Sequence, residues 1–98
     1  MTIHPKKELI EIDAAAFETR YRTHAALKEI FAGYDYYGSN LDALHDVLTS
    51  IAPDTILRII HFETAEQKLG TYAASLRRVF LESGEENPHL TVRFEDFP

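Results

Sequence analysis

The order of apolar and polar residues predicts three strands along the chain. Apolar and β-branched residues gather at 6–12, 55–62 and 89–94, which have the length and composition of strands. The stretch 55–62 is almost continuously apolar, which favours a strand buried on both faces, as in a parallel sheet. The last stretch alternates at a period of two instead, and its inward positions are Leu90, Val92 and Phe94.

Two helices are predicted between the first two strands. The first begins after Asp13, whose side chain can cap it, and ends near Gly33. Spacings near three and four residues predict that it faces the core with Phe17, Tyr21, Ala25, Leu27, Ile30 and Phe31. The second helix begins after Asn40, a good N-cap. It ends before Pro53, because the residue that precedes a proline disfavours helical geometry.

The second of these helices has two distinct sides. On a helical wheel at about 100° per residue, one side is apolar and consists of Leu41, Leu44, Leu48 and Ile51. Asp42 and Asp46 fall on the opposite side. Residues 32–39, which lead into the helix, are rich in Gly, Asp and Tyr and are predicted to form a loop.

The second half of the chain completes an α/β pattern. A short helix is predicted at 63–69, a break at Gly70, and a longer helix at 71–83 that Gly84 ends. The longer helix should face the core with Tyr72, Leu76, Val79 and Phe80. Strands separated by helical crossovers indicate a parallel sheet, so the sequence predicts an α/β fold.

Composition bounds the class of protein. Ninety-eight residues suit one domain, so residues 1–98 are predicted to form a single domain. The absence of cysteine excludes disulfides and thiolate chemistry. The N-terminal residues lack the apolar run of a secretory signal, and no apolar stretch approaches the roughly 18 residues of a membrane helix. These features predict a cytoplasmic protein with no membrane partner.

The charge pattern favours a basic protein as partner. A net charge of −6 argues against binding nucleic acid or an anionic membrane, since both interactions rely on Lys and Arg. No lysine or arginine occurs between Lys28 and Arg58, whereas this interval holds Glu29, Asp35, Asp42, Asp46 and Asp54. Uncompensated acid of this kind can steer a cationic protein toward the surface. The plainer interpretation is that the charge keeps a small domain in solution.

The most distinctive stretch runs from Tyr36 to Leu48 and reads YYGSNLDALHDVL. It resembles the signature of the barstar family, whose members are intracellular protein inhibitors of ribonucleases such as barnase. The matching positions are Tyr36-Tyr37-Gly38, Asn40 to Leu44, and Asp46. The order of predicted elements matches as well, so the resemblance covers nearly the whole chain. It implies a barstar-like two-layer fold, in which three to four helices pack on one side of a three-stranded parallel sheet.

The resemblance also implies a function, namely blocking the active site of a small secreted ribonuclease inside the cell that makes it. It implies that Tyr36 stacks on an active-site side chain and that Glu82 is an interface glutamate. His45 departs from the family pattern, which has a large aromatic residue there, although a neutral imidazole can still pack flat against a partner. The predicted partner-binding surface consists of Tyr36, Tyr37, Gly38, Asn40, Leu41, Asp42, His45, Asp46 and Glu82.

The acidic pair suits such a partner on physical grounds. A ribonuclease active site binds phosphate and therefore concentrates Arg, Lys and His, so a well-placed carboxylate can occupy a phosphate position. Side chains four residues apart on a helix have Cβ atoms about 5–6 Å apart, comparable to neighbouring subsites. The helix N-terminal dipole favours Asp42. Asp46 lies beyond the first turn, and a desolvated contact with arginine makes it the strongest expected contributor.

The residues before the helix have complementary roles. Tyr36 and Tyr37 offer large contact area at a low cost in conformational entropy. Gly38 lets the backbone approach the partner closely. Asn40 is expected to cap the helix and also to touch the rim of the interface.

Three other interpretations use the same helix. Paired aspartates can perform acid–base catalysis, for instance on a glycoside, but this chemistry needs a concave pocket rather than a convex helix face. Asp42, His45 and Asp46 have the spacing of metal ligands on one helix, yet no second cluster completes a site. A basic protein that is not a nuclease would also suit the surface. The leading interpretation is a non-enzymatic inhibitor without a cofactor, monomeric when free, which forms a one-to-one complex with a basic extracellular or toxin ribonuclease.

Overall fold

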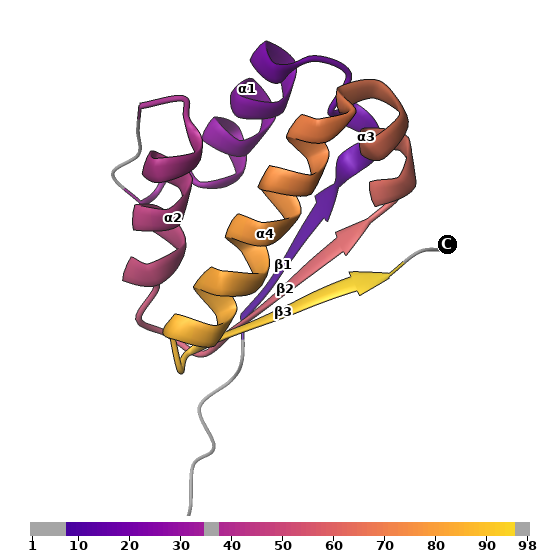
Figure 1. Cartoon of the computed structure of the whole chain (residues 1–98). Coiled ribbons are helices and arrows are strands. Elements are labelled where there is room, and N and C mark those ends of the chain that lie inside the picture. The colour runs from indigo at the N-terminus through magenta and orange to yellow at the C-terminus, as the bar shows by residue number, and fades with distance from the viewer. Residues whose placement is uncertain (1–7, 35–37, 96–98) are drawn as a thin grey trace, which may run out of the picture.

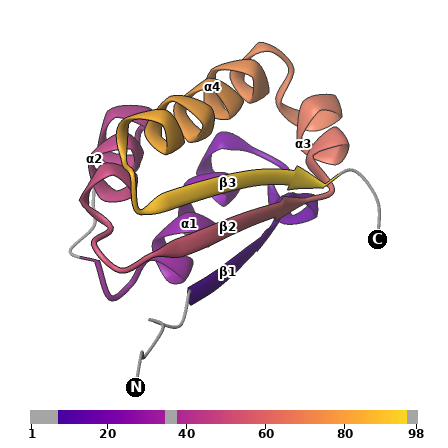
Figure 2. The same cartoon turned by 90° about the horizontal axis from the view of Figure 1, so that it is seen from below.

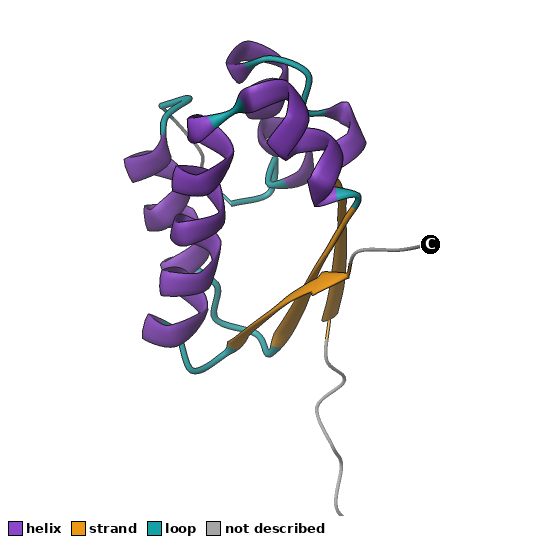
Figure 3. Ribbon diagram, turned by 45° about the vertical axis from the view of Figure 1, so that its right-hand side comes forward, coloured by secondary structure: helices purple, strands orange, loops and turns teal. Residues whose placement is uncertain are grey.

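Three parallel strands form the sheet of this protein. The computed structural model describes residues 8–34 and 38–95, and its strands are β1 (Glu8–Asp13), β2 (Thr55–Ile60) and β3 (Leu90–Glu95). They lie in the order β1-β2-β3, and both pairs are parallel (Figure 1). All helices of the described residues lie on one side of this sheet (Figure 3). The predicted α/β fold with a three-stranded parallel sheet is therefore confirmed.

The helical layer of the described residues consists of four α-helices and one short 3₁₀ helix. Between β1 and β2 lie η1 (Ala14–Ala16), α1 (Arg20–Ile30) and α2 (Leu41–Ser50). Between β2 and β3 lie α3 (Phe62–Leu69) and α4 (Thr71–Glu86). In the view from below, α2, α4 and α3 stand above the strands (Figure 2). The core fills the space between helices and sheet, and its largest buried side chains include Ile12, Phe17, Phe31, Leu44, Leu48, Leu57, Phe62 and Phe80.

The central strand differs from its prediction in one respect. Thr55, Leu57 and Ile59 of β2 are buried under the helices, whereas the alternate residues of the strand are partly exposed on the open face. On that face Arg58 forms ion pairs of 2.7 Å with Glu11 of β1 and with Glu95 of β3. The prediction of burial on both faces is wrong, because the described helices all cover the same face and ion pairs across the strands occupy part of the other.

The predicted first helix is in fact two helices. The carboxylate of Asp13 accepts a hydrogen bond of 3.0 Å from a backbone N–H of η1, and Thr19 caps α1 in the same way at 3.0 Å. Phe17, between the two helices, is fully buried. The interruption rotates the following residues, so Tyr21 and Ala25 are exposed and their predicted core positions are wrong. The side chains that α1 buries are Thr23, His24 and Leu27.

Two glycines in the second half of the chain have different roles. Gly70 has a φ of 58° and separates α3 from α4, as predicted. Gly84 does not end α4, which continues to Glu86, and that prediction is wrong. A Cβ atom at Gly84 would lie 3.0 Å from Cγ2 of Val92, so the glycine allows α4 to pack closely on β3. The sequence alone does not distinguish a glycine that ends a helix from one that, like Gly84, allows close packing within it.

Candidate protein-binding site

Helix α2 exposes the acidic pair because its other side is buried. Asn40 precedes the helix, and its Oδ1 accepts a hydrogen bond of 2.8 Å from the backbone N–H of Ala43, which confirms the predicted cap. The side chains that α2 buries are Leu44, Val47 and Leu48. Asp42 and Asp46 lie on the opposite side and are exposed. The helix ends at Ser50, before the proline that was expected to stop it.

Helices α2 and α4 run side by side in the same direction (Figure 1). Asn87 directly follows α4, and its Nδ2 donates hydrogen bonds of 2.9 Å to the carbonyl oxygens of Leu48 and Ile51. These bonds join the C-terminal ends of the two helices. The acids of one helix therefore have a fixed position relative to the acids of the other.

This arrangement places Glu82 near the acidic pair. His45 of α2 contacts Glu86 of α4 through its Nε2 atom. Glu82 is exposed and lies one turn before Glu86. Because the helices are parallel, that turn of α4 runs beside the first turns of α2, where Asp42 is located. Residues distant in the sequence thus contribute to one acidic surface, which we define as Asp42, Asp46 and Glu82.

The carboxylates of the acidic surface are exposed to solvent. Within the described ranges 8–34 and 38–95, none of its three carboxylates forms an ion pair. Repulsion between acids four residues apart on a helix costs only a few tenths of a kcal/mol. Asp42 lies in the first turn of α2, where the helix dipole favours a negative charge. The three carboxylates therefore face solvent on one side of the helical layer.

The other predicted site residues divide into three groups. Gly38 and Asn40 lead directly into α2, as expected. Leu41 is partly buried and packs against the core, and His45 is partly buried and held by Glu86, so neither is a free surface side chain. Tyr36 and Tyr37 lie outside the described residues.

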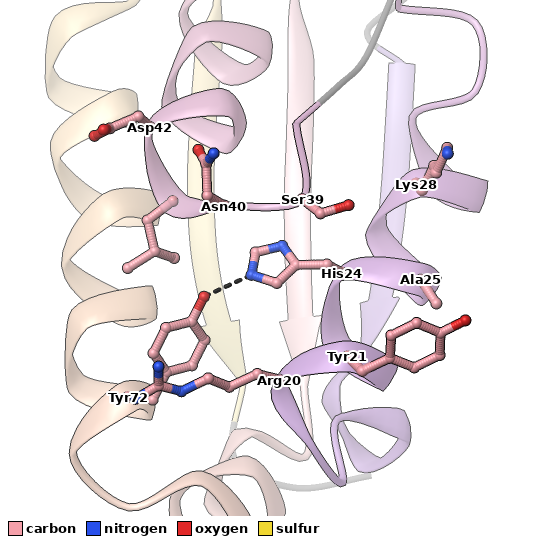
Figure 4. A pocket seen from close by; sticks show the side chains of 10 residues that line it. Arg20, Tyr21, His24, Ala25, Lys28, Ser39, Asn40, Asp42 and Tyr72 are labelled. Carbon is pink, nitrogen blue, oxygen red and sulfur yellow. Dashed lines mark hydrogen bonds between the residues drawn. The ribbon is translucent and has the colours of Figure 1, made fainter.

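A hollow of about 610 Å³ adjoins the start of α2, and the sequence did not indicate it (Figure 4). It is lined from α1 by Arg20, His24 and Lys28, and from α4 by Tyr72. The ring nitrogen Nε2 of His24 is hydrogen-bonded to the Tyr72 hydroxyl at 2.5 Å. Burial lowers the pKa of His24 below its usual value. Burial also raises the pKa of Tyr72, although the nearby Arg20 acts in the opposite direction.

Neither a candidate metal site nor a membrane-spanning helix is found in the part of the chain that the structure describes. No group of three His, Asp or Glu side chains there comes together in a way that could hold a metal ion. No described helix is long and apolar enough to span a bilayer.

The exposed acidic side of α2 thus belongs to a fold in which helices pack on one side of a three-stranded parallel sheet. The family model described as Barstar (barnase inhibitor) matches residues 7–95, and the chain belongs to this family. It is also similar to a protein of Bacillus subtilis (strain 168) that bears the name "Putative ribonuclease inhibitor YrdF". The two are 38% identical over 78 residues, which cover 79% of this chain and 86% of that protein. Members of the barstar family are inhibitors, so the prediction that this chain is not an enzyme is confirmed.

Proposed function

We propose that this protein inhibits a basic ribonuclease by placing carboxylates where the enzyme binds the phosphates of RNA. The observation that carries the proposal is the acidic surface of α2 and α4, whose three exposed carboxylates have no cationic partner among the described residues. Membership in the barstar family and similarity to a protein named as a ribonuclease inhibitor support the same function.

Asp46 is the residue that we expect to contribute most. It projects from the middle of α2, away from the buried side of the helix. In a closed interface its carboxylate would lose water and face an arginine or lysine that normally holds phosphate. Charge-assisted hydrogen bonds of this kind are about twice as strong as neutral ones. Asp42 and Glu82 extend the same negative field over neighbouring subsites of the enzyme.

The remaining site residues would shape the contact. Tyr36 and Tyr37 are proposed as aromatic anchors, and Gly38 as the point where the backbone approaches the enzyme. Asn40 would add a polar contact at the rim. His45, which is held against α4 by Glu86, would present the flat side of its imidazole to the partner.

The biological setting follows from the chemistry of the target. A cell that produces a basic secreted ribonuclease, or that receives one as a toxin, must protect its own RNA. The proposed inhibitor acts in the cytoplasm as an immunity protein. It is a monomer when free and binds one molecule of enzyme.

Titration of ribonuclease activity tests this function. Barnase and other basic ribonucleases are mixed with increasing amounts of the protein, and cleavage of RNA is followed directly. We expect activity to fall to near zero at one equivalent of protein for at least one of these enzymes. Full activity of every enzyme at a large excess of the protein would overturn the proposal.

A second candidate function is binding to a basic protein that is not a nuclease. The observation that favours it is His45, since the family has a large aromatic residue at this central position of α2. Capture of a partner on the immobilised protein, followed by an RNA cleavage assay of the eluted material, separates the two functions. A captured basic protein without nuclease activity would favour the second.

A further inference from the structure

The hollow beside α2 is continuous with the proposed interface. Asn40, Leu41 and Asp42 line it from the start of α2, and Asp42 also belongs to the acidic surface. The opposite wall is α1, which contributes Arg20 and Lys28 (Figure 4). A partner that covers Asp42 would therefore also cover the mouth of the hollow.

The hollow is lined by two cations, Arg20 and Lys28, and by one carboxylate, Asp42, although the protein as a whole is acidic. Arg20 and Lys28 are exposed, and neither forms an ion pair with any residue in the described ranges. The guanidinium of Arg20 lies 4.3 Å from the centre of the Tyr72 ring, which holds it beside the hollow. Figure 4 shows Lys28 at the other end of the same wall, with His24 between the two cations. The first turn of α2 adds the partial positive charge of a helix N-terminus.

We propose that this hollow receives an acidic side chain of the ribonuclease, so that the interface has an acidic half and a basic half. The inference rests on the proposed function. A ribonuclease needs a general base to remove a proton from the ribose hydroxyl, and a carboxylate is one of the groups that can serve. When the inhibitor covers the active site, an enzyme carboxylate would face the acids of α2 without a partner, which is costly in a desolvated contact. Arg20 and Lys28 would pair with it.

Two features favour an acidic protein side chain over RNA as the occupant. The cations adjoin the acidic surface, which repels a polyanion but suits a protein whose active site contains both signs of charge. The proposed interface also continues directly into the hollow through Asp42. Unlike charges placed side by side would make the complex form in a single orientation.

The test depends on the sign of a change in affinity. Lys28→Glu reverses a charge at the hollow, and Arg22→Glu reverses one on the same helix at a residue that does not line it. With a ribonuclease that the wild-type protein inhibits, we expect Lys28→Glu to weaken binding about tenfold or more and Arg22→Glu to leave it unchanged or tighter. If the enzyme surface is basic throughout, both variants bind more tightly, and the inference is wrong.

Other results of the same experiment are equally decisive. Arg20→Gln removes the other positive charge at the hollow without reversing it, and it should weaken binding as well. Far-ultraviolet circular dichroism of each variant, measured beside the wild type, checks that the fold is intact. If the free protein binds single-stranded RNA and Lys28→Glu abolishes that binding, the hollow serves nucleic acid and the inference fails.

If the wild-type protein inhibits no ribonuclease, the proposed function fails first. If it inhibits one and Lys28→Glu does not weaken the complex, only the inference about the hollow fails.

Discussion

The side-chain amide of Asn87 donates a hydrogen bond of 2.9 Å to the carbonyl oxygen of Leu48, and this bond joins the last turn of α2 to the end of α4. Asn87 is only 4% exposed, and its Oδ1 accepts a further hydrogen bond of 2.9 Å from the backbone N–H of His89. One buried side chain thus connects both acidic helices to the start of β3. The relative position of Asp46 and Glu82 depends on this connection.

Replacement of Asn87 by Ala should lower the free energy of unfolding by about 2 to 3 kcal/mol. The substitution leaves buried carbonyl groups at the end of α2 without a donor, and each such group costs about 1 to 3 kcal/mol. Urea unfolding followed by circular dichroism measures the effect. Glu85→Ala, at an exposed position of α4, serves as control and should change stability by less than about 0.5 kcal/mol. Equal stability of the two variants would show that Asn87 does not join the helices as described.

The parts of the fold that follow from short-range sequence signals were predictable. Asn40 as cap, Gly70 as break and the two sides of α2 each depend on a few neighbouring residues, and the structure confirms them. The parallel sheet followed from the order of strands and helices. These features need no knowledge of which residues meet in space.

The errors arise where tertiary contacts decide. Residues from Asp13 to Gly33 show helical spacing throughout, but burial of Phe17 and the cap at Thr19 divide them and change which side of α1 faces the core. Tyr21 is 83% exposed for this reason. Since the hollow is lined by residues of that rotated helix, the sequence pattern could not reveal it. The contact of His45 with a glutamate 41 residues away also has no local signal.

The stability of the protein should fall as the pH is lowered through the usual pKa of histidine. Burial lowers the pKa of His24, so the folded state keeps this imidazole neutral while the unfolded chain binds a proton below about pH 6.5. The stabilisation is therefore complete above that pH and is lost as the pH falls toward the lowered pKa of the folded state.

Comparison with His24→Gln isolates this contribution. The free energy of unfolding of each protein is measured by urea at about pH 7.5 and about pH 5.5, a range in which most carboxylates remain ionised. We expect the wild type to lose more stability than the variant between the two values. Because the other histidines are present in both proteins, their contributions cancel. An equal loss in both would contradict the assignment to His24.

The rate of association with the ribonuclease should depend strongly on salt. The carboxylates of Asp42, Asp46 and Glu82 are exposed, so they attract a basic enzyme at a distance, and salt screens this attraction. Stopped-flow fluorescence at about 0.05 M and about 0.5 M salt should show the association rate falling about tenfold or more, with a smaller change in dissociation. A salt effect confined to dissociation would argue against steering by the acidic surface.

The most direct test of the phosphate-mimic hypothesis is the affinity of Asp46→Asn for a ribonuclease that the wild-type protein inhibits. The substitution preserves the size of the side chain and removes its charge. Glu66→Gln makes the same change in net charge at an exposed position of α3 and serves as control. We predict that Asp46→Asn raises the dissociation constant about 100-fold or more, equivalent to about 2.7 kcal/mol, while Glu66→Gln changes it less than about threefold. Equal affinity of Asp46→Asn and the wild type would contradict the account.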